Sequence, residues 1–481
     1  MIKLRRIIEG ELIMYNLIII GAGPAGFFCA YEYHKLNKTG KVLVIDKGVS
    51  IYERNCPILD KKIEKCPAGK KEYPGCHPAC SITCGFGGAG AYSDGKFNIT
   101  DEFGGWLGEY ISKEKLLSLI EYVDSINILH GATHVITNPN TIEVREIERK
   151  GIAAGLKLLR AKVRHLGTEE NLKIMMSIYE YLKSKVEFKF RTVAENIIVE
   201  NGIIKGIITS EGEILNAKNV LIAPGRDGSM WLNTICKKHQ IKQSNNQVDI
   251  GVRVETNNVI MEEINTRLYE GKFVFNTSVN SLVRTFCSNP SGHVVIENYN
   301  GTMLANGHAY YDKSLGSDNT NFALLVSHNF ADPYDNPNEY GHAIGRIANK
   351  LSCGSVIVQR FGDLINGRRT TDKRLKNGFV KPTLKEAVPG DLGLVLPFNT
   401  LKSIIETIYA LDKITPGIAN EHTLLYGVET KFYSARPEVD DTLESKIKGL
   451  YFGGDGAGIT RGLAQAGASG VLVARSIFKK S

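Results

Sequence analysis

The sequence has no run of about 18 apolar residues, the length that a helix needs to cross a membrane. Its first 13 residues also lack the pattern of a secretory signal peptide, because charges interrupt the apolar residues and no small-residue cleavage site follows. These charges are Lys3, Arg5, Arg6, Glu9 and Glu11. We therefore expect a cytoplasmic protein with no membrane span, in which an N-terminal extension, 1–13, precedes a second candidate start at Met14.

Internal repeats and low-complexity segments are also absent. The 481 residues are enough for a large core and about two domains. The hydrophobic content of 43% and the charged content of 23% are ordinary for a globular protein. The formal net charge of +8 suits an acidic cofactor, an anionic substrate or a nucleic acid equally well, so it selects none of them.

A strand that leads into a glycine-rich turn is the first motif with chemical content. The apolar residues 17–20 run directly into the sequence GAGPAG. Gly21 permits the tight turn, Gly23 lets backbone N–H groups approach a pyrophosphate, and Gly26 lets a helix pack closely on the strand. The dinucleotide-binding turn is therefore predicted to comprise Gly21, Gly23, Pro24, Ala25 and Gly26.

The sequence after this turn keeps the order of a dinucleotide-binding unit. A helix is expected at 24–36, and its N-terminus would direct its positive end at the phosphates. A strand at 41–45 ends in Asp46, where a carboxylate would accept hydrogen bonds from both ribose hydroxyls of an adenine dinucleotide. We also expect the next residue, Lys47, to bind the cofactor. Because strand, helix and acid follow in this order, a glycine turn without a ligand is the less favoured interpretation.

The far end of the chain favours FAD over NAD. A strand at 450–452 runs into Gly454 and Asp455, and a helix of small residues follows. Asp455 would hydrogen-bond the ribityl chain, and the helix N-terminus would face the flavin pyrimidine and stabilise negative charge on the reduced ring. The cofactor-binding residues expected here are Gly454, Asp455, Gly458, Ile459 and Thr460.

A third segment of this kind lies in the middle of the chain. Residues 219–225 are typical of a strand that ends in a glycine turn, and a β-meander pattern with two turn signals precedes them at 196–217. The cofactor-binding residues expected from this part are Val193 and Gly225.

Three such segments in one chain resemble the flavoprotein superfamily that includes fumarate reductase flavoprotein subunits and aromatic hydroxylases. The loop GFGGAGAYSDGK at 85–96 and the sequence GDGAGITRGLAQAGASG at 454–470 are similar to FAD-dependent dehydrogenases of bacteria and archaea. The resemblance implies an α/β fold with a Rossmann-like FAD-binding domain, a parallel sheet with a β-meander, and a second α+β substrate domain inserted into it. We expect a discontinuous FAD-binding domain at 14–100, 185–230 and 430–481, and a substrate or cap domain at 101–184 and 231–429.

The loop at 85–96 supplies further candidates. Those expected at the cofactor are Gly87, Gly88, Ala89 and Gly90. Lys96 would orient an anionic substrate or stabilise an oxyanion, and Asp94 would act as an acid or base, unless both simply brace the loop. Arg461 is the third catalytic candidate, because it precedes the last helix, where a substrate carboxylate would lie above the flavin ring.

Cysteines cluster just before this loop. Five of the nine fall within 29 residues: Cys56, Cys66, Cys76, Cys80 and Cys84. In a reducing compartment this density favours metal ligation or redox chemistry over structural disulfides. Cys76, Cys80 and Cys84 would suit an iron–sulfur cluster or a zinc ion, although their spacing matches no standard motif. A flavin-coupled dithiol and inert thiols that line the loop stay open.

A second strand-led G-x-G-x-x-G is missing after Gly26, so a two-dinucleotide disulfide reductase is disfavoured and any NAD(P)H would bind transiently. The sequence APGRDGS at 223–229 is similar to the Asp-Gly motif of aromatic hydroxylases, but it occupies the middle glycine turn and lacks the expected later arginine. Hydroxylase chemistry is therefore disfavoured as well.

We predict an FAD-dependent oxidoreductase of the dehydrogenase or reductase type, whose flavin N5 exchanges a hydride with a small organic substrate. An anionic substrate is one option. An electron-transfer partner is left open. Three alternatives remain: a flavin-dependent isoprenoid or lipid reductase, which predicts a long apolar tunnel; an FAD-dependent tRNA-modifying enzyme; and a thiol or flavin redox sensor. The basic residues look dispersed and no aromatic platform is evident, so no stable nucleic-acid partner is expected.

Overall fold

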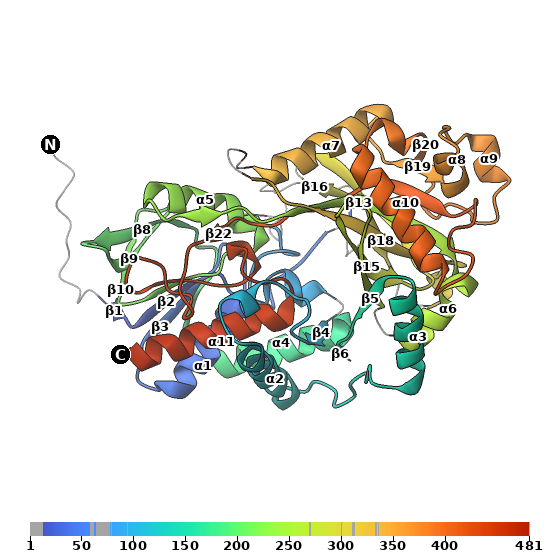
Figure 1. The fold of residues 1–481 in the computed structure, drawn as a ribbon. Coiled ribbons are helices and arrows are strands. Elements are labelled where there is room, and N and C mark those ends of the chain that lie inside the picture. Colours follow the sequence, from blue (N-terminus) through green and yellow to red (C-terminus); the bar gives the residue numbers. More distant parts are fainter. Residues whose placement is uncertain are drawn as a thin grey trace. The chain divides into compact units, whose positions relative to one another are not determined.

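The computed structural model describes residues 13–57, 62–63, 77, 79–93, 95–268, 271–299, 301–309, 313–331, 334 and 336–480. The chain forms two compact units (Figure 1). The first unit comprises Met1–Ile136, Lys162–Ser244 and Ser434–Ser481, and the second comprises Thr137–Ala161 and Asn245–Tyr433. Among the described residues, no helix combines the length and the apolar character that crossing a membrane requires.

A five-stranded parallel sheet forms the centre of the first unit. Its order is β23 (Leu450–Phe452), β11 (Val220–Ile222), β2 (Leu17–Ile20), β3 (Val42–Ile45) and β7 (Glu187–Lys189). Every residue of β2, β3, β11 and β23 is buried, as in parallel sheets that are covered on both faces. The strands at the start, middle and end of the sequence are therefore neighbours in one sheet.

Two helices from opposite ends of the chain pack on each other in this unit. They are α1 (Pro24–Leu36) and α11 (Leu463–Lys480). A Cβ atom at Gly470 would lie 2.0 Å from the carbonyl oxygen of Ala25, so only glycine permits this approach. The contact joins the first and the last segment of the unit into one core.

The β-meander has the predicted form. Strands β8 (Ala194–Glu200), β9 (Ile203–Thr209) and β10 (Ile214–Ala217) are antiparallel, and β1 (Met14–Tyr15) adds to β10 in parallel. A parallel sheet with a meander, together with a second unit, confirms the predicted fold class. The other helices and strands of this unit are β4 (Lys96–Ile99), α2 (Lys113–Leu129), β6 (Lys162–His165), α4 (Thr168–Leu182), α5 (Ser229–Lys238), β12 (Gln243–Ser244) and β22 (Arg436–Pro437).

An eight-stranded sheet forms the centre of the second unit. Its order is β20 (Val388–Pro389), β19 (Ile357–Arg360), β21 (Leu424–Lys431), β13 (Val248–Asn257), β18 (Asn319–His328), β15 (Leu282–Asn289), β14 (Lys272–Asn276) and β5 (Leu156–Leu159). The remaining elements are α3 (Ile142–Ala153), α6 (Asn258–Arg267), the hairpin β16 (His293–Tyr299) and β17 (Thr302–His308), α7 (Pro337–Leu351), α8 (Phe361–Ile365), α9 (Asp372–Lys376) and α10 (Phe398–Asp412).

The boundaries of the units differ from the predicted domain boundaries. The segments 101–136, 162–184 and 231–244 belong to the first unit, although we expected them in the substrate domain. The reason lies in packing, since Ile120 on α2 and Ile178 on α4 are buried in the core that contains the parallel sheet. Apolar residues spaced three and four apart predict helices at 114–129 and 169–184, but this periodicity does not say which core an apolar face will join. The assignment of FAD and substrate to the two units stays a prediction.

Candidate functional site

The first glycine turn has the backbone geometry that its sequence predicts. Gly21 has φ +105°, and a Cβ atom there would lie 2.1 Å from the carbonyl oxygen of Ala223. A Cβ atom at Gly26 would lie 1.8 Å from the carbonyl oxygen of Gly21. Both positions therefore require glycine, one for the turn and one for close packing of α1 on β2.

Gly23 has a different role, because the space beside it is open. The nearest atom to a Cβ placed there is the Cα of Gly88, at 3.9 Å. Gly23 is the N-cap of α1 and offers no side-chain cap, so among the residues that the structure describes no capping side chain satisfies the first-turn N–H groups. Open space before uncapped N–H groups at a positive helix end is suited to a pyrophosphate.

The second glycine loop lies against the first. The N–H of Gly87 donates to the carbonyl oxygen of Ala22 at 2.8 Å. A Cβ atom at Gly88 would lie 3.2 Å from the Cα of Gly23, and one at Gly90 would lie 3.5 Å from Cγ of Pro24. The structure thus brings the predicted residues of the loop to the predicted turn, and Ala89 lies between Gly88 and Gly90 in the short helix η2 (Gly88–Tyr92).

Asp46 ties these segments together. Its Oδ2 accepts a hydrogen bond from the N–H of Ala22 at 2.8 Å, and its Oδ1 accepts from the N–H groups of Gly48 at 2.7 Å and Gly85 at 2.9 Å. We predicted Asp46 as the acceptor for ribose hydroxyls. A carboxylate can accept about four hydrogen bonds, so these three leave room for a ribose contact, which stays a prediction.

Lys47 forms an ion pair with Asp227, to which the thiol of Cys84 also donates at 3.5 Å. Burial alone would lower the pKa of Lys47, but the hydrogen bond to Asp227 raises it above its ordinary value. Burial raises the pKa of Cys84 to about 12. Lys47, predicted at the cofactor, is thus engaged by a residue of the middle glycine turn, and Cys84 is a protonated thiol at neutral pH.

The last predicted segment is organised around Asp455. Its Oδ1 accepts from the hydroxyl of Thr460 at 2.8 Å, and its Oδ2 accepts from the N–H of Gly462 at 3.0 Å. Burial raises the pKa of Asp455, while the Gly462 bond and the charges of Arg226 and Arg461 act in the opposite direction. The carboxylate of Asp455, the first residue of the short helix η7 (Asp455–Ala457), is therefore fixed near the start of α11. Gly458 follows with φ +66°, and Ile459 is fully buried.

The three glycine turns meet at close range. Gly21 lies against Ala223, as described above, and a Cβ atom at Gly456 would lie 2.2 Å from the carbonyl oxygen of Gly225. A Cβ atom at Gly454 would lie 3.1 Å from Cβ of Ala25. Val193 has its own place in the meander, where its carbonyl oxygen accepts from the N–H of Ser210 at 2.9 Å.

The catalytic candidates lie in different surroundings. Lys96 is half-buried at the start of β4, opposite His165 of β6. Arg461 is half-buried, and its backbone N–H donates to the carbonyl oxygen of Gly104 at 2.6 Å. Asp94 lies outside the described residues.

The sequence did not predict that the segment around Gly105 packs on Ile459 and Thr460. The N–H of Trp106 donates to the carbonyl oxygen of Ile459 at 2.8 Å, and a Cβ atom at Gly105, which has φ +126°, would lie 2.5 Å from Cα of Thr460. The paired glycines at 104 and 105 were the available signal, because consecutive glycines allow such a close backbone approach.

Arg54 is a second residue that the sequence did not reveal. It is 7% exposed, and its guanidinium donates to the carbonyl oxygens of Ser81 at 2.8 Å, Ile82 at 2.9 Å and Phe86 at 2.6 Å. It holds the segment that leads into the second glycine loop. A lone arginine whose partners are backbone carbonyls leaves no pattern in a sequence.

The predicted metal ligands receive no support. Cys66 and Cys76 lie outside the described residues, Cys80 is exposed and Cys84 is buried. In the part of the chain that the structure describes, no three His, Cys, Asp or Glu side chains are grouped so as to hold a metal ion.

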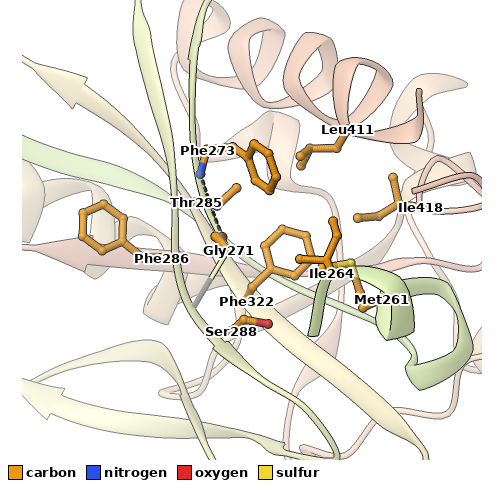
Figure 2. A pocket seen from close by; sticks show the side chains of 10 residues that line it. All are labelled: Met261, Ile264, Gly271, Phe273, Thr285, Phe286, Ser288, Phe322, Leu411 and Ile418. Carbon is orange, nitrogen blue, oxygen red and sulfur yellow. Dashed lines mark hydrogen bonds between the residues drawn. The ribbon is translucent and has the colours of Figure 1, made fainter. Parts of the chain in front are cut away.

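The second unit contains a small apolar cavity, shown in Figure 2. Its lining includes Met261, Ile264, Phe273, Phe322, Leu411 and Ile418. The interior has space for about one water molecule. This cavity is far too small for the isoprenoid chain that a lipid reductase would have to bind.

Comparisons with known proteins agree with the class predicted from the sequence. A family model described as "FAD-dependent protein, C-terminal domain-like" matches residues 247–432. This match supports an FAD-dependent oxidoreductase. An uncharacterized protein of Clostridium beijerinckii (strain ATCC 51743 / NCIMB 8052) is 25% identical over 495 residues, which cover 98% of this chain and 82% of that protein.

Solved structures are similar to this chain only at a low level. The quinol fumarate reductase FrdA of E. coli has a TM-score of 0.36 and 13% identity, over 97% of this chain and 70% of that chain. L-proline dehydrogenase from P. horikoshii has a TM-score of 0.36 and 12% identity, over 97% of this chain and 94% of that chain.

Proposed function

We propose that the first unit of this FAD-dependent oxidoreductase binds FAD at the meeting point of its three glycine turns, and that the flavin exchanges a hydride with a small organic substrate. The observation that carries the proposal is the close approach of three segments far apart in sequence, seen at Gly21 with Ala223 and at Gly456 with Gly225. Such a convergence at the carboxyl ends of parallel strands is where α/β sheets bind dinucleotides.

The residues present suit this cofactor. The open space at Gly23 and the uncapped start of α1 fit the pyrophosphate. Asp455 would accept a hydrogen bond from the ribityl chain, and the start of α11 would face the pyrimidine ring. When bound, FAD supplies hydride transfer at its N5 atom.

The protein's own groups would then position the substrate. Arg461 precedes α11 and lies close enough to Asp455 to influence its ionisation, so it adds positive charge at this helix end. Pairing of its backbone with Gly104 fixes the segment that carries it. We propose that Arg461 holds an anionic group of the substrate, and that Lys96 is a second cation for the same purpose.

The test is a substitution that closes the space at Gly23 without straining the backbone. Gly23 has φ −74° and ψ −176°, which alanine adopts freely, so Gly23→Ala should fold normally while its methyl group occupies the expected pyrophosphate position. Gly108→Ala is the matched control, since its added Cβ would meet only Cδ2 of Leu116, at 3.5 Å.

Both variants are purified and the bound flavin is released and quantified, with the thermal midpoint measured alongside. We expect Gly23→Ala to lose at least about 10-fold in FAD affinity, equivalent to ~1.4 kcal/mol, with an unchanged midpoint. Full FAD occupancy in Gly23→Ala, or a wild-type protein that binds no flavin, would show the proposal to be wrong.

A further inference from the structure

The positive charge of this protein is concentrated in one short stretch of the second unit. Between Arg360 and Glu386, eight residues are Lys or Arg and three are acidic, an excess of five within a chain whose formal net charge is +8. This stretch contains α8 and α9, which lie beyond β19 and β20 in Figure 1. The expectation that basic residues are dispersed therefore does not hold for this stretch, as the count along the sequence shows.

Seven of these side chains form what we call the basic surface. Its members are Arg368, Arg369, Lys373, Arg374, Lys376, Lys381 and Lys385. Arg374 is half-exposed and the other six are exposed. Because they reach solvent, their charge is available to a partner instead of being neutralised in a core.

A buried carboxylate holds the arginines of this surface in place. Asp363 is fully buried, and its Oδ1 accepts from Nε of Arg368 at 2.7 Å and lies 3.7 Å from Nε of Arg374. Its Oδ2 accepts from the hydroxyl of Thr370 at 2.7 Å and lies 3.9 Å from Nη1 of Arg360. Arg360 also lies 3.3 Å from Oε2 of Glu421, so two carboxylates face three guanidinium groups and a local positive excess is left in a fixed arrangement.

An exposed aromatic ring lies in the same stretch of sequence as these cations. Phe379 is 79% exposed and lies in sequence between Lys376 and Lys381. Its ring centroid is 4.3 Å from that of His422, with the planes tilted by 55°. At this exposure the outer face of Phe379 is accessible to another ring, and it is the neighbouring cations that distinguish it from the other exposed apolar side chains.

These observations favour a nucleic acid over a protein as the partner. Lysine is depleted at protein–protein interfaces, whereas four lysines contribute to the basic surface. Guanidinium groups match phosphate oxygens in two-point contacts, and an exposed aromatic ring beside them provides a stacking platform for an unpaired base. A duplex has no free base face to offer to Phe379.

We propose that the basic surface binds a single-stranded nucleic acid, with phosphates at the arginines and lysines and one base stacked on Phe379. Asp363 is a positioning residue in this arrangement, because it fixes Arg368 and Arg374 without reaching the ligand. The proposal does not depend on FAD, since it concerns residues of the second unit alone.

The test is fluorescence anisotropy with the full chain and a fluorescein-labelled oligouridylate, with an oligonucleotide duplex of equal length and polyglutamate as competitors. Phe379→Ala should weaken binding about 10-fold at constant salt through loss of stacking. The pair Lys376→Gln and Lys381→Gln should lower the slope of log K against log salt by about one for each lysine. The matched control is Lys237→Gln with Lys238→Gln, two exposed lysines of α5 in the other unit.

Binding that prefers the single strand, falls in Phe379→Ala and is unchanged in the control pair would support the proposal. Three results would overturn it: no binding of the oligouridylate by the wild type, equal losses in the control pair and the test pair, or competition by polyglutamate as strong as that by unlabelled oligouridylate. The last two would indicate unspecific attraction and an acidic protein site, respectively. Thermal midpoints of all variants establish that each one is folded.

Discussion

The N–H of Gly85 donates a 2.9 Å hydrogen bond to the carboxylate of Asp46, which also accepts from the N–H of Ala22. One side chain at the end of β3 therefore connects the first glycine turn, which contains Gly23, with the second glycine loop. The position of the second loop depends on this acid as much as on its own glycines.

Asp46→Asn should loosen this connection. An amide offers one acceptor oxygen where the carboxylate has two, so at least one of the three backbone N–H groups would lose its partner. We expect a loss of about 1–3 kcal/mol of stability and weaker FAD binding. Thermal denaturation and flavin titration measure the two effects. Glu170→Gln is the control, since both side chains of its ion pair with Lys173 are exposed; equal losses in both variants would refute the connection.

Arg54→Lys should destabilise the segment that leads into the second loop. A single ammonium group cannot reproduce the fork that serves three carbonyl oxygens. We expect a loss of about 2 kcal/mol and faster proteolysis between residues 81 and 86. Arg149→Lys, on an exposed arginine of α3, should change neither quantity. Unaltered proteolysis in Arg54→Lys would mean that the loop is held by other contacts.

Cys84 should react slowly with iodoacetamide at neutral pH, while Cys80 should react quickly. Burial raises the pKa of Cys84 to about 12, and the thiolate is the reactive form. Cys80 is exposed. Peptide mapping by mass spectrometry after timed alkylation distinguishes the two. A sample purified without oxygen should also be analysed for iron, zinc and sulfide. A stoichiometric metal, or rapid alkylation of Cys84, would show that a thiolate is stabilised there.

Two glutamates of the second unit should give opposite pH dependences of stability. Burial raises the pKa of Glu255, despite hydrogen bonds from Thr383 and Tyr426. Its ionisation therefore costs stability above its folded-state pKa, and the cost is relieved as the pH falls through that value. The hydrogen bond from Ser278 lowers the pKa of Glu406. The stability that Glu406 contributes is therefore present above its unfolded-state pKa and is lost as the pH falls through its folded-state pKa.

We expect the thermal midpoint of Glu255→Gln, relative to the wild type, to decrease as the pH is lowered from 8 to 5. For Glu406→Gln the deficit relative to the wild type should shrink as the pH is lowered from 5 to 3. Parallel pH profiles for the two variants would contradict these assignments.

How much of this structure the sequence predicts depends on how far apart in sequence the interacting residues lie. The turn at Gly21 to Gly26 was predictable because its chemistry is local and its spacing is constrained by backbone sterics. The role of Asp46 as a connector was not, because its partner Gly85 is distant in sequence and donates only a backbone N–H. Arg54 was missed for the same reason.

Similar limits apply to the basic surface. The excess charge between Arg360 and Glu386 is visible in the sequence, but the burial of Asp363 and the exposure of Phe379 are not. A buried acid that orders several guanidinium groups is recognised only when the strand and helix that carry them are placed in space.

The contact between Gly470 and Ala25 sets a limit on when the cofactor site can form. The helix that carries the first glycine turn acquires its contact with α11 only after residues 463–480 have been made. Completion of this core is therefore a long-range event that joins segment 24–36 to segment 463–480, and contacts so far apart in sequence are expected to form slowly.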